Sequence, residues 1–120
     1  MSTKSVLIIN RTPPYGSSSP REALDIALTC SIFEQPVSLL FLGTGIFQLL
    51  NSQNTETIEQ KNLESIMSSL PMYDIDQLYT TKSSLEAYDL TAEDLSLPVQ
   101  IIDDTGVATL INDHETVLTF

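Results

Sequence analysis

Residues 37–50, VSLLFLGTGIFQLL, contain the most informative pattern for the fold of this chain. Val37–Leu42 is a short continuous apolar run, which is typical of a strand buried on both faces of a sheet. A Gly-x-Gly turn at Gly43–Gly45 follows, and Ile46–Leu50 is predicted to form a short helix. Such a sequence can cradle a phosphate, or it can be a tight turn that leads an apolar helix onto a partner.

The sequence lacks most of the other residues that a phosphate-binding motif requires. A dinucleotide-binding fingerprint needs a third glycine where Gln48 stands, and the Gly-Lys-Ser/Thr of a P-loop is absent from the chain. The tight turn is therefore favoured. Apolar residues cover most of the short helix, although a helix lying on a sheet can bury only one stripe. We predict that part of this set packs against another subunit: Ile46, Phe47, Leu49 and Leu50.

The rest of the chain alternates predicted strands and helices. Further strands are predicted over Lys4–Asn10, Gln77–Thr81, Val99–Asp103 and Thr116–Phe120. Helices are predicted from Ser19 (as N-cap) and Pro20 as far as Gln35, over about Glu56–Leu70 and over Ser83–Tyr88, with a turn or short helix over Asp104–Asp113. This alternation with short connections predicts an α/β fold, with an open parallel sheet covered by helices on both sides.

Length and composition predict one domain over residues 1–120, with a hydrophobic fraction of 42% that suffices for a core. No apolar run approaches the roughly 18 residues of a membrane helix. The apolar core of the N-terminus, Val6–Ile9, is too short for a signal peptide. The single cysteine, Cys30, excludes an intramolecular disulfide. We therefore expect a cytoplasmic protein without membrane contact.

Acidic residues dominate the charge. Sixteen acids oppose five bases, giving a formal net charge of −11. From Asp74 to the end there are ten acids and one base, Lys82. Direct nucleic-acid binding needs clustered Lys and Arg, so it is not expected here. Two explanations of the acidity remain open, namely solubility and charge complementarity to a basic partner.

The residues that could carry chemistry do not gather into a catalytic set. Cys30 falls near the end of its predicted helix, where the helix dipole disfavours a thiolate. His114 has no second His or Cys three or four positions away, and it is predicted to lie in a solvated turn. The carboxylates of Asp103–Asp104 and Glu93–Asp94 are adjacent in sequence and should point apart. We expect no catalytic residue, no cofactor and no metal.

Several motifs together resemble the TusC/DsrF family of the DsrE/DsrF-like sulfur-relay proteins, over nearly the whole chain. They are Pro14-x-Gly16, Arg21-Glu22-x-Leu24-Asp25, Gly43-x-Gly45-Ile46-Phe47-Gln48-Leu49-Leu50, Leu70-x-x-Tyr73-Asp74-Ile75 and Val117-Leu118-x-Phe120. The resemblance implies a three-layer α/β/α domain around a five-stranded, mainly parallel sheet. This agrees with the fold class predicted from the residues.

The resemblance also implies a function. In such systems, TusC-like chains join TusD/DsrE-like and TusB/DsrH-like subunits in a heterohexamer that passes on persulfide sulfur. The destination is 2-thiolation of the tRNA wobble uridine, or, in DsrF-like proteins, dissimilatory sulfur oxidation. A stand-alone enzyme or a homo-oligomeric small-ligand binder that uses Gly43–Gly45 is the alternative outside this class.

The sulfur-carrying relatives hold their cysteine near the end of a middle strand, just before a short helix. The resemblance places Thr81 near that position, and a threonine alcohol cannot carry a persulfide. Cys30 lies on a different predicted element. Two departures from the family pattern, at Thr44 and over Glu86–Asp89, weaken any role in shaping an active site. The chain is therefore expected to be a non-catalytic subunit.

Overall fold

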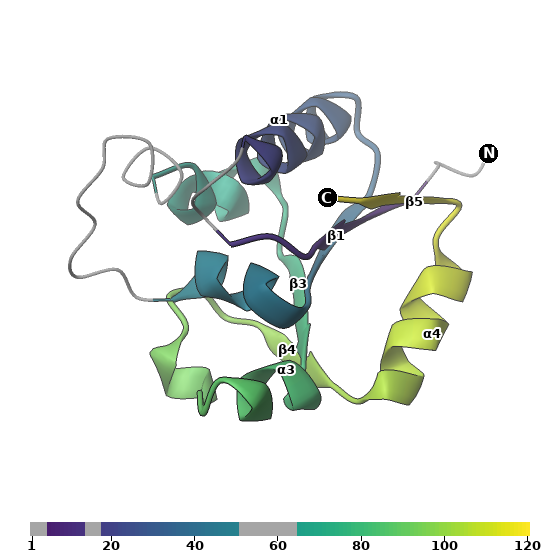
Figure 1. Cartoon of the computed structure of the whole chain (residues 1–120). Coiled ribbons are helices and arrows are strands. Elements are labelled where there is room, and N and C mark those ends of the chain that lie inside the picture. Colours follow the sequence, from purple (N-terminus) through teal and green to yellow (C-terminus); the bar gives the residue numbers. More distant parts are fainter. Residues whose placement is uncertain (1–4, 14–17, 51–64) are drawn as a thin grey trace.

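A computed structural model describes residues 5–13, 18–50 and 65–120 (Figure 1). Its strands form one five-stranded sheet in the order β4-β3-β2-β1-β5, and each neighbouring pair is parallel. The strands are β1 (Val6–Asn10), β2 (Val37–Phe41), β3 (Gln77–Thr81), β4 (Gln100–Ile102) and β5 (Thr116–Thr119). The predicted α/β class with a parallel sheet is confirmed.

Helices cover both sides of this sheet, and Figure 1 shows α1 and α4 on opposite sides of it. The helical segments are α1 (Ser19–Ile32), η1 (Gly43–Leu49), η2 (Leu70–Tyr73), α3 (Lys82–Ala87), η3 (Ala92–Asp94) and α4 (Asp104–Asp113). Residues 65–69 are also helical, whereas most of the helix predicted over Glu56–Leu70 falls outside the described residues. Among the described segments, none is a helix of the length and apolarity that a membrane crossing requires.

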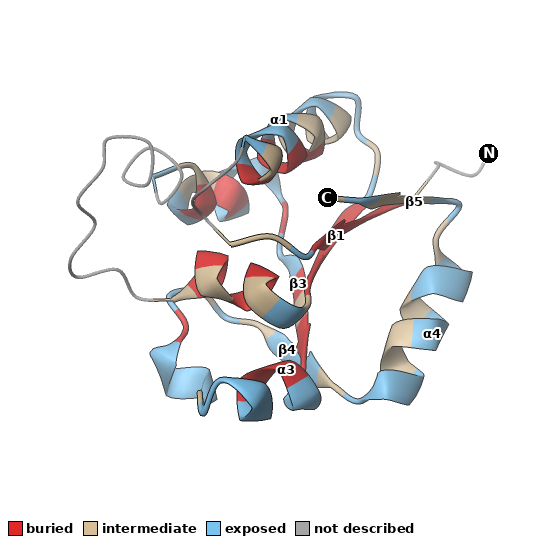
Figure 2. Ribbon diagram, viewed as in Figure 1, coloured by how far each residue is buried: buried red, intermediate tan, exposed pale blue. Residues whose placement is uncertain are grey.

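Alternating side chains on the strands build two cores. Val37, Leu39 and Phe41 of β2 point into the larger core, which α1 and η1 cover. Leu40 of the same strand belongs to the smaller core on the other face, together with Leu7 and Ile9 of β1. α4 lies over this smaller core, yet no residue of α4 is buried. Figure 2 shows the contrast between the buried strands and the exposed or intermediate surface of α4.

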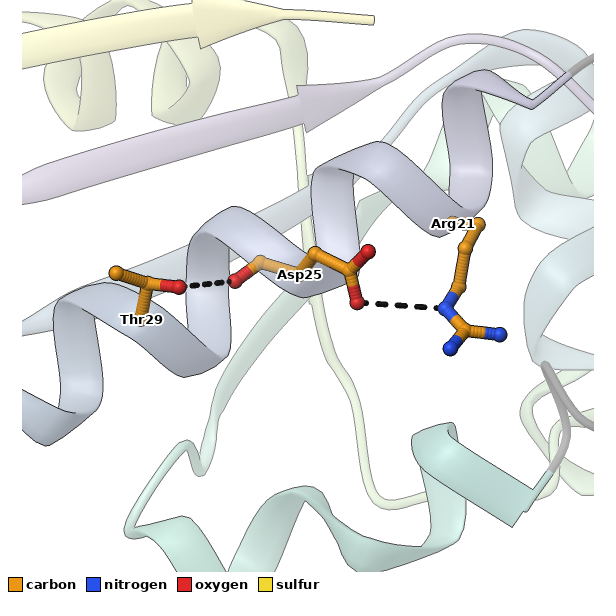
Figure 3. A network of polar contacts seen from close by, with 3 residues as sticks. All are labelled: Arg21, Asp25 and Thr29. Atoms are coloured by element: carbon orange, nitrogen blue, oxygen red, sulfur yellow. Dashed lines mark hydrogen bonds and ion pairs between the residues drawn. The ribbon is translucent and has the colours of Figure 1, made fainter.

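The first helix begins one residue earlier than predicted. Ser18, not Ser19, is the N-cap, and Pro20 stands in the first turn as expected. On the outer side of α1, Arg21 Nε lies 3.3 Å from Asp25 Oδ1, and Thr29 Oγ1 donates a 2.8 Å hydrogen bond to the Asp25 carbonyl (Figure 3). The side chains of Arg21 and Asp25 are 54% and 59% exposed, so this side of α1 is a solvated surface. Exposed pairs of this kind contribute about 0.3–0.5 kcal/mol to stability.

Candidate functional site

The Gly43–Gly45 turn lies at the carboxyl end of the sheet and crosses the end of β1. Gly43 has a φ of +53°, a conformation that side chains other than glycine rarely adopt. A Cβ on Gly45 would lie 2.0 Å from the Asn10 carbonyl oxygen, so only glycine fits there. Thr44 Oγ1 donates a 2.9 Å hydrogen bond to the Arg11 carbonyl. The glycines therefore permit a close contact between backbones.

Two backbone amides of the turn, which a bound phosphate would need as hydrogen-bond donors, already donate hydrogen bonds within the chain. The Gly43 amide donates to Ser84 Oγ at 3.1 Å, and the Gly45 amide donates to the Leu42 carbonyl at 2.9 Å. A phosphate cradle requires free amides that point at the anion. The geometry therefore agrees with the structural turn favoured by the sequence, and it disfavours a ligand loop.

The η1 helix begins at Gly43, three residues before the predicted helix start. Ile46 and Leu49 are 0% exposed, because the larger core covers them on one side. On the other side, the Leu49 carbonyl accepts a hydrogen bond from the Ser96 amide, which brings a distant segment against the helix. Ile46 and Leu49 therefore offer no surface to another subunit, which corrects our expectation for these two residues.

Phe47 and Leu50 are half-buried and keep part of their surface. The Phe47 ring packs against Tyr88, the C-cap of α3, with ring centroids 4.7 Å apart in an edge-on arrangement. Leu50 pairs with Leu95 in an isolated antiparallel bridge. A contact between Phe47 or Leu50 and another subunit stays a prediction.

Thr81 stands at the junction of β3 and α3, where the resemblance places the thiol of sulfur-carrying relatives. Thr81 is 2% exposed and is the N-cap of α3, since its Oγ1 accepts a 3.1 Å hydrogen bond from the Ser84 amide. The same hydroxyl donates to Ser84 Oγ at 2.7 Å, and Ser83 Oγ lies 3.2 Å away. A hydroxyl network therefore fills the junction and joins it, through Ser84, to the turn at Gly43.

Cys30 lies apart from this junction. It is half-buried near the end of α1 and packs against the larger core. Its carbonyl accepts a 3.0 Å hydrogen bond from the Gln35 amide, so it belongs to the turn that ends the helix. This position near the end of the helix agrees with the one expected from the sequence.

His114 is not the solvated turn residue that we predicted. Its Nδ1 lies 2.6 Å from the Leu110 carbonyl oxygen, and its Nε2 lies 3.0 Å from Ser38 Oγ. Because a carbonyl only accepts hydrogen bonds, Nδ1 carries the proton. Ser38 is buried at the start of β2. His114 therefore fastens the end of α4 to the sheet, a contact between residues 76 positions apart.

One residue of each acidic pair takes part in capping a helix. Asp103 Oδ1 accepts a 2.8 Å hydrogen bond from the Gly106 amide at the start of α4. Asp94 forms a capping box with Thr91. Asp104 Oδ1 lies 3.3 Å from Ser83 Oγ. Over residues 5–13, 18–50 and 65–120, His, Cys, Asp and Glu form no group of three or more that could hold a metal ion.

The fold and this junction define a parallel α/β domain whose β3–α3 junction is lined with hydroxyl groups. The sequence profile of the DsrE/DsrF-like family matches residues 4–120. A protein named TusC homolog from Pseudomonas aeruginosa is 40% identical over 98% of both chains. The intracellular sulfur oxidation protein DsrF from Allochromatium vinosum is 33% identical over 98% of this chain and 96% of its own.

Among solved structures, the ychN protein from E. coli superimposes with a TM-score of 0.79 over 98% of this chain and 100% of that one. At 20% sequence identity this similarity shows the fold. The family match and the two relatives also show the family. This chain belongs to the DsrE/DsrF-like family and is a homologue of TusC and DsrF.

Proposed function

We propose that this chain, as a single domain over residues 1–120, is a non-catalytic subunit of a heterohexameric sulfur-transfer complex. The observation that carries the proposal is Thr81. The resemblance places it near the position where sulfur-carrying relatives hold their thiol, and its hydroxyl is buried and caps α3. The one thiol of the chain, Cys30, lies on α1. The persulfide is therefore carried by a partner, a TusD/DsrE-like subunit, and a TusB/DsrH-like subunit completes the complex.

The pathway served is 2-thiolation of the tRNA wobble uridine. The 40% identity to the TusC homolog from Pseudomonas aeruginosa supports this choice. The acidic chain does not bind the tRNA itself, because it lacks the clustered Lys and Arg that a phosphate backbone requires. A role in sulfur oxidation is the second candidate, and the DsrF relative supports it. Because the DsrF relative is an intracellular sulfur oxidation protein, we propose that this chain is intracellular too.

Phe47 and Leu50 form the carboxyl-edge surface, a name that we keep for these two residues. We propose that this surface contacts a neighbouring subunit. Binding energy at an interface is concentrated in a few buried aromatic or apolar anchors. The Phe47 ring is already held by Tyr88, so little conformational freedom is lost when a partner covers it.

The decisive experiment is co-expression of the tagged chain with the DsrE-like and DsrH-like proteins of the same organism, followed by native mass spectrometry. We expect a complex with two copies of each subunit. Incubation with a persulfide donor should add a sulfur atom to the DsrE-like subunit and not to this chain. The variant Cys30→Ser should transfer sulfur as the wild type does.

Other outcomes would overturn the proposal. Recovery of this chain as a monomer or homo-oligomer, in the presence of both candidate partners, would exclude an obligate subunit. Sulfur on Cys30 that is lost during transfer would assign the chain a catalytic role. A complex that supports sulfur oxidation and not tRNA thiolation would favour the second candidate.

The carboxyl-edge surface is tested in the same complex. Phe47→Ala should weaken association by about 2 kcal/mol. The matched control is Ile111→Ala, which removes an exposed apolar side chain from α4. Thermal melting of the isolated variants separates loss of binding from loss of folding. An intact complex with Phe47→Asp would exclude Phe47 from the interface.

A further inference from the structure

A group of large apolar side chains is exposed at the end of α1 and on η2. The three most exposed large apolar side chains among the described residues are Met72 at 85%, Phe33 at 73% and Ile32 at 68%, and Tyr73 is 43% exposed. These four residues are called the amino-edge patch. Ser31 Oγ donates a hydrogen bond to the Tyr73 carbonyl, which joins the two segments side by side. The four side chains therefore belong to one surface region, and exposed apolar groups of this kind mark interaction sites.

The patch lies at the opposite end of the sheet from Phe47. α1 leads from β1 back to the amino end of β2, and η2 immediately precedes the amino end of β3. The carboxyl-edge surface, by contrast, belongs to the segment that follows β2. A subunit that carries both surfaces can contact two different partners at once.

Acidic residues border the patch. Glu34 directly follows Phe33, Asp74 directly follows Tyr73, and both acids are exposed. The two segments 29–36 and 71–77 contain one further acid, Asp76, and no Lys or Arg. The rim of the patch is therefore negative.

Both rim acids, Glu34 and Asp74, have a backbone conformation in which glycine would make the folded chain more stable. The φ angle is 59° at Glu34 and 60° at Asp74, in the left-handed region. Each residue follows a helix end, the place where glycine is the usual choice. The Glu34 amide donates to the Ser31 carbonyl, and the Asp74 amide donates to the Pro71 carbonyl, contacts that glycine would also make. Glycine at either position would therefore remove a charge without removing a local hydrogen bond of the backbone.

We propose that the amino-edge patch docks a protein partner whose apolar contact residues are bordered by Lys or Arg. The inference rests on the proposed function, because the partner is another subunit of the same complex. A second copy of this chain does not fit. A two-fold pairing through the patch would bring Glu34 and Asp74 towards their equivalents, and each chain carries a net charge of −11. A basic rim on a different protein removes this repulsion and provides complementary charge.

The test uses the complex assembled from the three co-expressed chains, with this chain varied. The double variant Phe33→Ser/Met72→Ser should weaken association at least tenfold, measured by titrating the variant into the two partner proteins. Its melting temperature should equal that of the wild type, since both side chains are exposed. The matched control is Ile101→Ser, an apolar residue on β4 that is 43% exposed.

The variants Glu34→Gly and Asp74→Gly test the rim. Both should keep or raise the melting temperature, because glycine suits the left-handed conformation. Both should weaken association several-fold, and the dependence of binding on NaCl concentration should become less steep. Weaker binding by a more stable variant cannot be attributed to unfolding.

Three results would overturn the proposal. If all patch and rim variants bind as the wild type does, the patch is not a docking surface, and the proposed function stands. If the isolated wild type dimerises and Phe33→Ser abolishes the dimer, the occupant is a second copy. If the wild type forms no complex with the two partners, the proposed function fails first, and the docking proposal fails with it.

Discussion

The two faces of the sheet are covered to very different extents. On one face, α1, η1 and residue Met67 pack over fully buried strand side chains such as Ile8 and Phe41. On the other face, α4 lies over Leu7 and Leu40 but buries none of its own residues. The central strands β1 and β2 are buried on both faces, yet the two helix layers are unequal. We infer that the first face provides most of the stability and that α4 is held mainly by its two ends.

The largest effect should come from the well-packed face. Phe41→Ala removes a side chain that is 0% exposed, and it should lower the free energy of unfolding by about 3–5 kcal/mol. Urea unfolding followed by circular dichroism measures the change. A loss below about 1 kcal/mol would contradict the inference that this face dominates stability.

Gly45→Ala should be the next most harmful change. The new Cβ would lie 2.0 Å from the Asn10 carbonyl oxygen, so η1 must move away from β1, at a cost of about 3 kcal/mol. Gly43→Ala is the control. It meets open space but keeps a positive φ, and it should cost only about 1 kcal/mol. Equal losses in urea unfolding would mean that the close backbone contact is unimportant.

Leu110→Ala tests the thinner layer directly. Leu110 is half-buried against the smaller core, so its truncation should cost about 1.5 kcal/mol, well below the loss for Phe41. Ile111, its exposed neighbour on α4, provides the control, and Ile111→Ala should stay within about 0.5 kcal/mol of the wild type. If Leu110→Ala matched Phe41→Ala in urea unfolding, the two faces would be equivalent.

Thr81→Val replaces the N-cap of α3 by an apolar residue of similar shape. It should cost about 1 kcal/mol, because the Ser84 amide loses its hydrogen-bond acceptor. Thr81→Ser keeps the hydroxyl and should restore most of the stability. Thermal melting compares the variants. A loss for Thr81→Ser with none for Thr81→Val would show that the methyl group of Thr81, rather than its cap, matters.

The smallest effect concerns the C-terminal end of α4. A double-mutant cycle with His114→Ala and Ser38→Ala should give a coupling energy of about 0.5–1 kcal/mol for the contact between Nε2 and Ser38 Oγ. Hydrogen exchange of the last α4 amides should accelerate in either single variant. A coupling energy of zero in urea unfolding, together with unchanged hydrogen exchange, would show that the contact between His114 and Ser38 does not hold α4 to the sheet.

Local sequence patterns predicted most of the fold. The strand predicted over Gln77–Thr81 has those bounds in the structure, and the segment predicted as a turn or short helix over Asp104–Asp113 is a helix with those bounds. Apolar runs and helix caps act over a few residues, so they are readable in the chain itself. The glycine turn was also predicted correctly as a structural feature.

Errors arose where distant segments meet. The apolar residues of η1 suggest an interface, but Ile46 and Leu49 are buried within the chain. Ser96, 47 positions from Leu49, donates a hydrogen bond to the Leu49 carbonyl. The sequence predicts a solvated His114, because nothing near it in the chain indicates Ser38 as its partner. Phe33 is apolar and yet 73% exposed, because it lies beyond the end of α1.

The alternation of strands and helices, the acidic charge and the presence of threonine at position 81 can all be read from the sequence. They depend on residue identity and on the spacing of apolar residues, which is two residues in strands and three to four in helices. The burial of Ile46 and the exposure of Ile32, by contrast, follow from the packing of the folded chain. Burial of a side chain depends on the elements that pack against it. In this fold those elements come from remote parts of the chain, whose arrangement no local pattern specifies.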